Sequence, residues 1–353
     1  MAYPFTNDHD MIREAARGFL QAWYDSGKGP EKIYKSGTPF DAEAWKSFAQ
    51  EMGMAGIAID EAYGGAGLGD LGRIVVMEEL GASLCAIPFL TCCGIVTDII
   101  ETAGEEKAQS ELLPKIAAGE LTIAYCDGHD ASQKVVSHVA YAAHADMIVL
   151  SRRVADGIDY FAISKDAQGL VITPEKTMDP TRGFASVDWS LVSESDLQII
   201  GYGSEERHEK LITHSFIALG AECIGGAQKC LDMTLEYSSQ RIQFGRPIAS
   251  FQAIKHRCAD MFILIEAARS AVYAAAMAPT EEKTAAALIA KAYAADAFLK
   301  VAGDAIQLHG GIGFTWEYPL HFFFKRARAN CAMFGNSYTD YSRLADYIFG
   351  DAA

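Results

Sequence analysis

The sequence has little that would suit it to a membrane or to nucleic acid. Half of its 353 residues are hydrophobic, yet no stretch approaches the roughly 18 uninterrupted apolar residues that a membrane-spanning helix needs. The 46 acidic residues outnumber the 30 basic ones, and the formal charge of −16 argues against nucleic acid or an anionic membrane as a partner. The first residues, MAYPF, include neither the basic nor the apolar segment of a signal peptide.

Cysteine pairs of the C-x-x-C type are also missing. None of the eight cysteines forms such a pair, and no histidine lies at ligand spacing from them, so the sequence indicates no structural metal. Cys223 and Cys230 lie one heptad apart in a helical pattern, which is typical of small core residues. Together with the lack of a signal peptide, this cysteine usage favours a reduced, cytoplasmic enzyme.

The first third of the chain shows a helical pattern. Between residues 9 and 23, apolar residues recur at the 3.6-residue spacing of one helix face. Asp41 is a plausible N-cap for a further helix, which Gly53 is expected to end. Pro114 and Gly119 are expected to end this helical region.

The middle of the chain alternates with a period of two instead. Its short strand candidates are separated by Asp, Gly and Pro, and their spacing favours a small antiparallel sandwich or barrel. These candidates are residues 121–126, 134–142, 147–150, 160–164 and 169–173. The sequence therefore predicts an α+β protein of three domains: a helical domain (1–118), a β domain (119–203) and a C-terminal helical bundle (204–353).

An alanine-rich helix of the bundle, expected to begin near Thr280, ends in a glycine-rich stretch. Residues 305–319 read AIQLHGGIGFTWEYP. One glycine is enough to cap a helix, so the surplus after Gln307 suggests a backbone that a large ligand approaches closely. A cap followed by a tight turn is the alternative. A second glycine-rich turn, residues 60–70, either closes over a ligand or simply connects two helices, and it is no nucleotide fingerprint because no strand precedes it.

Two motifs carry a resemblance to a known family. Residues 241–252 read RIQFGRPIASFQ, and residues 307–313 read QLHGGIG. With the order helix, sheet, helix, they resemble the acyl-CoA dehydrogenase family over nearly the whole chain. The resemblance implies an N-terminal all-α domain, a small middle β-sandwich or barrel and a C-terminal four-helix bundle. It also implies an FAD-dependent α,β-desaturation of an acyl-CoA thioester.

The resemblance assigns residues to the adenosine and pyrophosphate half of FAD. Arg241 matches the arginine that reaches the pyrophosphate, and a guanidinium suits this role because it is permanently charged and donates two parallel hydrogen bonds. In the family this cluster completes an FAD site held mainly by a neighbouring subunit. The other residues that the resemblance places along this half of the cofactor are Gln243, Phe244, Gln252, Gln307, Gly310 and Gly311.

The carboxylate that the family uses to remove the α-proton of the thioester is missing. A desolvated glutamate suits that role because burial raises its pKa and makes it a better base. The family places this glutamate at either of two positions, and the matching residues here are Ser215 and Gly335. The sequence therefore offers no catalytic residue.

The segment that holds the flavin ring is missing as well. The family usually has a Thr-Glu-Pro…Gly-Ser-Asp stretch there, whereas residues 124–130 read AYCDGHD and run into KVV at 134–136. The chain thus keeps the motifs for the adenosine end of FAD and lacks those for the flavin ring and the proton transfer.

These losses predict the short, non-basic subunit of a heterotetrameric (α2β2) acyl-CoA dehydrogenase of the type that acts on steroid side-chain thioesters. A longer, dehydrogenase-like partner would supply the base, and an electron-transfer flavoprotein would accept the electrons. Two alternatives stay open. One is a self-sufficient homo-oligomer with another base, for which Asp130, Glu317 and Asp340 are the nearest acids. The other is a flavin-free structural or regulatory partner.

Overall fold

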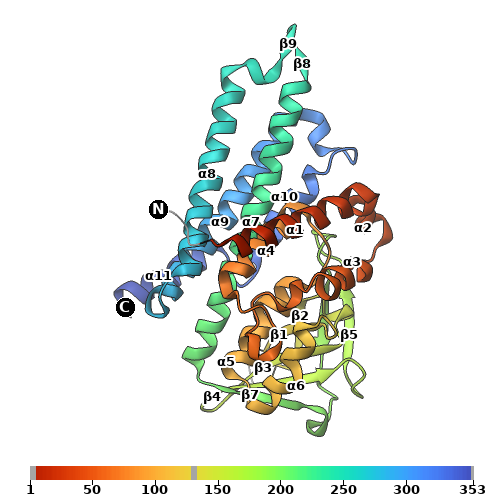
Figure 1. Ribbon diagram of the computed structural model, residues 1–353, viewed down its shortest axis with the longest axis vertical. Coiled ribbons are helices and arrows are strands. Elements are labelled where there is room, and N and C mark those ends of the chain that lie inside the picture. The colour runs from red at the N-terminus through yellow and green to blue at the C-terminus, as the bar shows by residue number, and fades with distance from the viewer. Residues whose placement is uncertain (1–4, 129–132, 351–353) are drawn as a thin grey trace. The chain divides into compact units, whose positions relative to one another are not determined.

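The computed structural model describes residues 5–128 and 133–350 (Figure 1). The N-terminal helices are α1 (Asn7–Trp23), α2 (Pro30–Ser36), α3 (Ala42–Lys46), α4 (Gly69–Ser83), α5 (Thr97–Ala103) and α6 (Glu106–Ala117). The strands that follow are β1 (Ile123–Gly128), β2 (Val135–Ala140), β3 (Met147–Val154), β4 (Gly157–Ser164), β5 (Val171–Glu175), β6 (Phe184–Asp188) and β7 (Gln198–Gly203). The C-terminal elements are α7 (Glu205–Gln240), β8 (Ile242–Gln243), β9 (Arg246–Pro247), α8 (Gln252–Met277), α9 (Thr280–His309), α10 (Leu320–Ala332) and α11 (Ser337–Phe349). This order confirms the predicted fold class.

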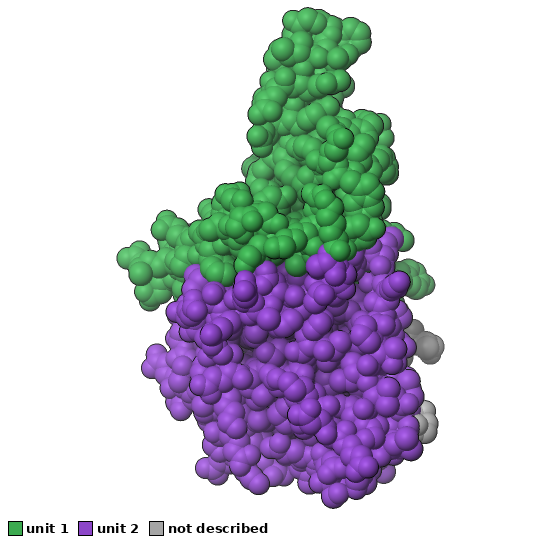
Figure 2. All heavy atoms as spheres, turned by 90° about the vertical axis from the view of Figure 1, so that its right-hand side faces the viewer, with its two compact units in different colours: residues 1–35, 74–85, 216–353 green, residues 36–73, 86–215 purple. Residues whose placement is uncertain are grey.

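The chain divides into two compact units that do not follow its linear order. Unit 1 contains residues 1–35, 74–85 and 216–353, and unit 2 contains residues 36–73 and 86–215 (Figure 2). Two helices, α4 and α7, begin in unit 2 and continue in unit 1. The units are described separately below.

Unit 2 holds two sheets that share one core. One sheet has the strand order β1-β3-β4-β7, and the other has the order β2-β6-β5. Side chains from both sheets, among them Ile148, Phe161 and Val187, lie in a common buried cluster, so this region is a sandwich. The expected antiparallel arrangement is wrong at one place, because β1 and β3 pair in parallel. Parallel neighbours need a crossover connection, and the chain makes it by passing through β2 in the other sheet.

The alternating pattern does not reveal β6 or β7. In β6 only Ala185 and Val187 are buried, which is too short an alternation to recognise. In β7 the pattern is interrupted by Gly201, where a Cβ atom would lie 1.9 Å from the carbonyl oxygen of Ala103. The strand passes too close to the end of α5 for any side chain, and this closeness cannot be read from the local sequence.

The first predicted helix ends are confirmed. The Asp41 carboxylate accepts a hydrogen bond from the backbone N–H of Ala44 at 2.9 Å, which caps the start of α3. The helical stretch that follows ends at Glu51, and Gly53 leaves it with a left-handed φ of +68°. Glycine is favoured there because a Cβ atom would clash with the preceding carbonyl.

The expectation that Pro114 ends a helix is wrong. Helix α6 continues through it to Ala117, and the chain turns only at Gly119, whose φ is +67°. A proline one turn from a helix end removes one hydrogen bond. Burial of Leu113 and Ile116 on the same turn offsets that cost, since both side chains are fully enclosed.

Unit 1 is organised around α9, which packs against α8, α10 and α11 (Figure 1). Its buried face is largely alanine, as the sequence predicts, and the small side chains let neighbouring helices approach. Helix α7 also contacts α9 at Gly226, where a Cβ atom would lie 2.3 Å from the ring of Phe298. No helix within residues 5–128 and 133–350 combines the length and apolar character needed to cross a membrane.

Buried charges tie the N-terminal helices to the bundle within unit 1. The Glu78 carboxylate of α4 accepts hydrogen bonds from Arg13 at 2.9 Å, Arg269 at 3.1 Å and the Tyr273 hydroxyl at 2.6 Å. Burial alone raises the pKa of Glu78, but the two guanidinium groups and the tyrosine outweigh it, so that its pKa lies below the usual 4.5. The native state therefore binds this proton less tightly than the unfolded chain does.

The Glu78→Gln variant should lower the free energy of unfolding by about 1.5–3 kcal/mol at pH 7, because it weakens hydrogen bonds between charged groups, while Arg13 keeps Glu79 and Arg269 keeps Glu266 as ion-pair partners. Because the pKa of Glu78 is lowered in the native state, its contribution to the free energy of unfolding is complete above pH 4.5. This contribution decreases as pH falls through the native pKa of Glu78. Urea denaturation at pH 7 and pH 4 measures both effects. The control is Glu31→Gln, which removes an exposed pair with Lys35 and should cost less than about 1 kcal/mol. Equal losses for the two variants would contradict the assignment.

Candidate cofactor site and the positions of the missing base

The motif of residues 241–252 forms a hairpin between the end of α7 and the start of α8 (Figure 1). Strands β8 and β9 pair across a two-residue turn, in which Phe244 and Gly245 have φ values of +53° and +75°. Positive φ at both central residues is what a type I′ turn requires, and asparagine or glycine usually stands where Phe244 does. A left-handed phenylalanine costs about 1–3 kcal/mol, and strain of this kind gathers at functional sites.

The side chains of this hairpin point into solvent. Phe244 is 91% exposed, and Arg241 and Gln243 are exposed as well. Arg246 is placed over the ring of Phe251, with its guanidinium carbon 4.1 Å from the ring centre. Arg241, in contrast, has no carboxylate at ion-pair distance among the described residues. Its guanidinium is therefore available to an anion from outside the chain.

The ends of α7, α8 and α9 lie at the same level of unit 1. Arg257 of α8 pairs with Asp304 of α9 at 2.6 Å. Helices α8 and α9 are antiparallel. Gln252 precedes Arg257 by five residues and His309 follows Asp304 by five residues, so Gln252 and His309 also lie at one level. His309 stacks on Tyr237 of α7 at 4.3 Å, one turn before Arg241. The structure thus brings both predicted motifs to one end of the bundle.

The two adjacent glycines have different explanations. Helix α9 ends at His309, and Gly310 follows with φ +63° and ψ −142°, a conformation that glycine alone adopts readily. The cap is a sufficient reason for Gly310. At Gly311 φ is not positive, and a Cβ atom there would meet nothing within 4 Å. Nothing within the described chain requires a glycine at position 311, so it leaves a patch of exposed backbone beside exposed Gln307.

These residues fit the adenosine and pyrophosphate half of a dinucleotide cofactor. They combine an unpaired guanidinium, three exposed carboxamides and a bare stretch of backbone at one end of the bundle. They include no group suited to a flavin ring or to proton transfer. Across the described residues, no three His, Cys, Asp or Glu side chains gather as a metal site would need.

The strand that the resemblance places beside the flavin ring uses its polar side chains for contacts within unit 2. The Asp127 carboxylate of β1 accepts a hydrogen bond from the Ser151 hydroxyl at 2.7 Å, and Tyr125 shares that hydroxyl at 3.1 Å. His208 lies 3.6 Å from Asp127 and contacts the Tyr160 hydroxyl at 2.9 Å. The polar groups of this strand are thus used within the unit. His129 and Asp130 lie outside the described residues.

The two positions for the base carry no acid, and the aromatic residues next to them meet. Ser215 is fully buried, and its hydroxyl donates to the carbonyl oxygen of Ile212 at 2.6 Å. Its neighbour Phe216 stacks on Phe334, which precedes Gly335, at 5.7 Å between ring centres. Two positions 120 residues apart in sequence therefore adjoin one aromatic stack.

The nearest alternative acids do not resemble a poised base. Asp340 is completely buried and pairs with Lys291 at 2.6 Å. Burial raises the pKa of Asp340 although Lys291 acts in the opposite direction, and the ammonium already occupies one of its oxygens. The patterns in the sequence do not identify Lys291. The available signal is a lone lysine within the alanine-rich stretch AAALIAKAYAA of a core helix.

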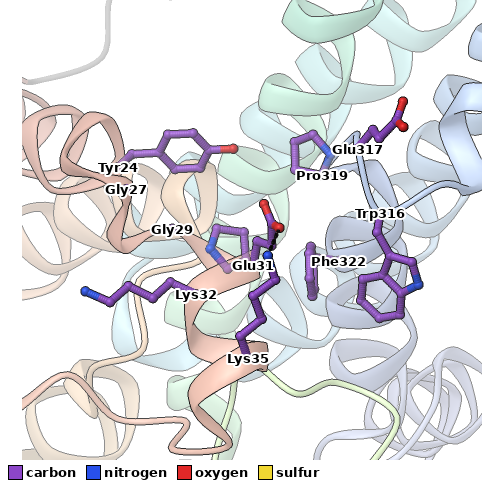
Figure 3. Close-up of a pocket in the computed structure, with 11 residues that line it drawn as sticks. Tyr24, Gly27, Gly29, Glu31, Lys32, Lys35, Trp316, Glu317, Pro319 and Phe322 are labelled. Carbon is purple, nitrogen blue, oxygen red and sulfur yellow. Dashed lines mark hydrogen bonds and ion pairs between the residues drawn. The ribbon is translucent and has the colours of Figure 1, made fainter.

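Glu317 belongs to a different feature. It lies at the edge of a cavity of about 460 Å³ within unit 1, which aromatic residues, prolines and lysines line (Figure 3). Figure 3 shows its carboxylate directed away from Phe322. The side chain is exposed, and a solvated carboxylate lacks the desolvation that a base for an α-proton needs.

Known proteins resemble this chain over most of its length. The family model described as "Acyl-CoA dehydrogenase, N-terminal domain" matches residues 6–120, and "Acyl-CoA dehydrogenase, C-terminal domain" matches residues 206–348. Acyl-CoA dehydrogenase IpdE2 of Mycolicibacterium smegmatis is 31% identical over 96% of this chain and 99% of its own length. Its namesake in Mycobacterium tuberculosis is 34% identical over 92% of both chains. A solved structure of the Tcur3481-Tcur3483 steroid ACAD has 26% identity and a TM-score of 0.83, covering 97% of this chain and 98% of that one.

Proposed function

Since the chain belongs to the acyl-CoA dehydrogenase family, whose members are oxidoreductases acting on CH–CH bonds, we propose that it is the non-basic subunit of a heteromeric enzyme. One observation carries this proposal. Arg241, Gln252 and Gly311 are exposed at one end of the bundle, while Ser215 and Gly335 stand at the positions that the resemblance assigns to the base. The chain would complete an FAD site whose reacting half lies in another subunit.

Each exposed residue has a part in holding the adenosine half of FAD. The Arg241 guanidinium would donate paired hydrogen bonds to the pyrophosphate, and the backbone at Gly311 would approach the cofactor closely. Gln243, Gln252 and Gln307 supply amide donors and acceptors, and Phe244 supplies an apolar face. FAD, when bound, accepts the hydride that leaves the β-carbon of the thioester. The carboxylate that removes the α-proton would come from the partner subunit.

The substrate and partners follow from the relatives. The name of the Tcur3481-Tcur3483 steroid ACAD joins two proteins. This supports a heteromer in which the present chain and a longer, dehydrogenase-like subunit form an α2β2 assembly. The same name supports a CoA thioester derived from a steroid as the substrate. An electron-transfer flavoprotein is the expected electron acceptor of such a complex.

The two other candidate functions fit the structure less well. A self-sufficient enzyme needs a base, but Asp340 is paired with Lys291 and Glu317 is solvated. A flavin-free structural partner does not explain an exposed Arg241 that has no ion partner among the described residues, close in sequence to a strained, exposed Phe244.

The assembled complex should contain one flavin for every two chains. Each productive site needs one flavin cradle and one adenosine-end cluster, and this chain offers only the cluster. At the other site, its own β region would face the partner's cluster, and the adenosine contacts alone should not retain the cofactor. Flavin absorbance against protein concentration, read with the mass of the complex in solution, gives the ratio. A ratio of one flavin per chain would show that this subunit does hold a flavin ring.

A further inference from the structure

Lys291 is a buried lysine at the heart of unit 1. It is 1% exposed and lies on the alanine-rich face of α9. Its ammonium donates to the carbonyl oxygen of Gly335 at 2.5 Å and to the Asp340 carboxylate at 2.6 Å. Burying an ammonium is costly unless it is paired and hydrogen-bonded, and these two acceptors satisfy it.

The carbonyl that Lys291 binds belongs to an unusual turn. Phe334 and Gly335 both have left-handed backbones, with φ values of +60° and +103°. On the far side of this turn, the Asn336 side chain accepts a hydrogen bond from the backbone N–H of Thr339 at 3.0 Å and caps α11. The C-terminal end of the turn is therefore held by two contacts, one from Lys291 of α9 and one at the start of α11.

The fixed turn places an aromatic ring beside the former base positions. The Phe334 ring lies over Phe216, and two cations lie near the same Phe216 ring. The Lys291 ammonium is 5.4 Å from its centre, and the Arg343 guanidinium is 5.6 Å away. Phe216, which follows Ser215, and Phe334, which precedes Gly335, thus form an aromatic stack with two cations near it.

We propose that Lys291 is a positioning residue that fixes the backbone turn at the position where relatives carry the base. Its ammonium holds the turn that carries Phe334 and Gly335 and, with Arg343, adds positive charge near any carboxylate placed there. The inference rests on the proposed function in one respect: it takes positions 215 and 335 as those where relatives carry the base.

The reason is electrostatic. A carboxylate that removes an α-proton must be desolvated without a cation next to it, so that its pKa rises. An opposite charge within about 4–6 Å lowers the pKa of a carboxyl group by about 1–3 units and weakens it as a base. A carboxylate restored here by a single substitution would therefore lie near the positive charge of Lys291 and Arg343 and would be a weaker base.

The test compares an introduced carboxyl group in two backgrounds. Phe334 already carries a side chain at positive φ, so Phe334→Glu is the probe and Phe334→Gln is its uncharged control. Both variants are made in the wild-type chain and in a chain with Lys291→Met and Asp340→Leu, in which the buried ion pair is absent. The melting temperature of each probe relative to its control, measured against pH, reports the midpoint of the new carboxyl group.

With Lys291 present, the midpoint should lie at or below about 4.5, and without the pair it should rise by about 1 unit or more. Arg343 and Asp296 also act on this region and are unchanged in both backgrounds. Equal midpoints in the two backgrounds would overturn the proposal, since Lys291 would then not control a carboxyl group at this position.

A second measurement does not depend on the probe. Lys291→Met and Asp340→Leu should each lower the melting temperature by roughly 5–10 °C, and together they should recover most of it, because both charges then leave the core. The control is Lys300→Met on the same helix, whose lysine is 58% exposed. Single variants that melt like this control would also overturn the proposal. Neither measurement needs flavin or partner, so its failure is separable from that of the proposed function.

Discussion

Purified without a partner, this chain should oxidise acyl-CoA thioesters at least about 100-fold more slowly than the assembled complex. General acid–base catalysis by a positioned group contributes about 10²–10⁴-fold, and no acid stands at Ser215 or Gly335. Asp340 cannot substitute, because Lys291 already holds it in a fully buried pair. For the chain alone, we expect only the slow reduction of flavin or dye that occurs when no base removes the α-proton.

Reduction of a dye acceptor by a CoA thioester measures this difference. The chain alone, the longer dehydrogenase-like subunit alone and the two together are assayed with FAD added in excess. Activity that appears only in the mixture supports the division of labour. Turnover by the chain alone at the rate of the mixture would establish a self-sufficient enzyme. The base would then have to be a residue at a position other than Ser215 and Gly335.

Arg241→Ala should weaken the retention of FAD by the complex about tenfold or more. A charge-assisted hydrogen bond to phosphate contributes roughly 1.5–3 kcal/mol, and Arg241 has no ion partner within the described chain whose loss would disturb the fold. Arg241→Lys keeps the charge but loses the paired geometry, so its affinity should fall between those of the wild type and the alanine variant.

Flavin content after dialysis, followed by titration of the stripped complex with FAD, gives the affinities. The matched control is Lys255→Ala, which removes another exposed cation, one turn into α8 from the same hairpin. If the Arg241 and Lys255 variants retained FAD equally well, the pyrophosphate contact would have to be assigned elsewhere.

The sequence predicts those parts of the fold that depend on local signals. The apolar stripe of α1, the cap at Asp41, the start of α9 near Thr280 and its end before Gly310 are confirmed. Each depends on residues within one or two turns of each other. The helix-ending role of Pro114 is wrong because burial of its neighbours, a property of the folded chain, outweighs the local preference.

Features set by distant residues were out of reach of the sequence pattern. The parallel pairing of β1 with β3 depends on the path of β2 through the other sheet. At the candidate site, the motifs of residues 241–252 and 307–313 identify which residues are exposed together, but not that Tyr237 and His309 hold the helix ends at one level. Lys291 is the clearest omission, since its partners Gly335 and Asp340 lie more than 40 residues away.

The hairpin after α7 has a consequence for how subunits would meet. Its type I′ turn is already formed in the single chain, with Phe244 held at positive φ and almost fully exposed. A loop that orders only on contact loses conformational entropy at that moment, which weakens the complex and slows its formation. Here that loss is incurred when the chain itself folds, so a partner would meet a tip whose backbone already has its turn conformation.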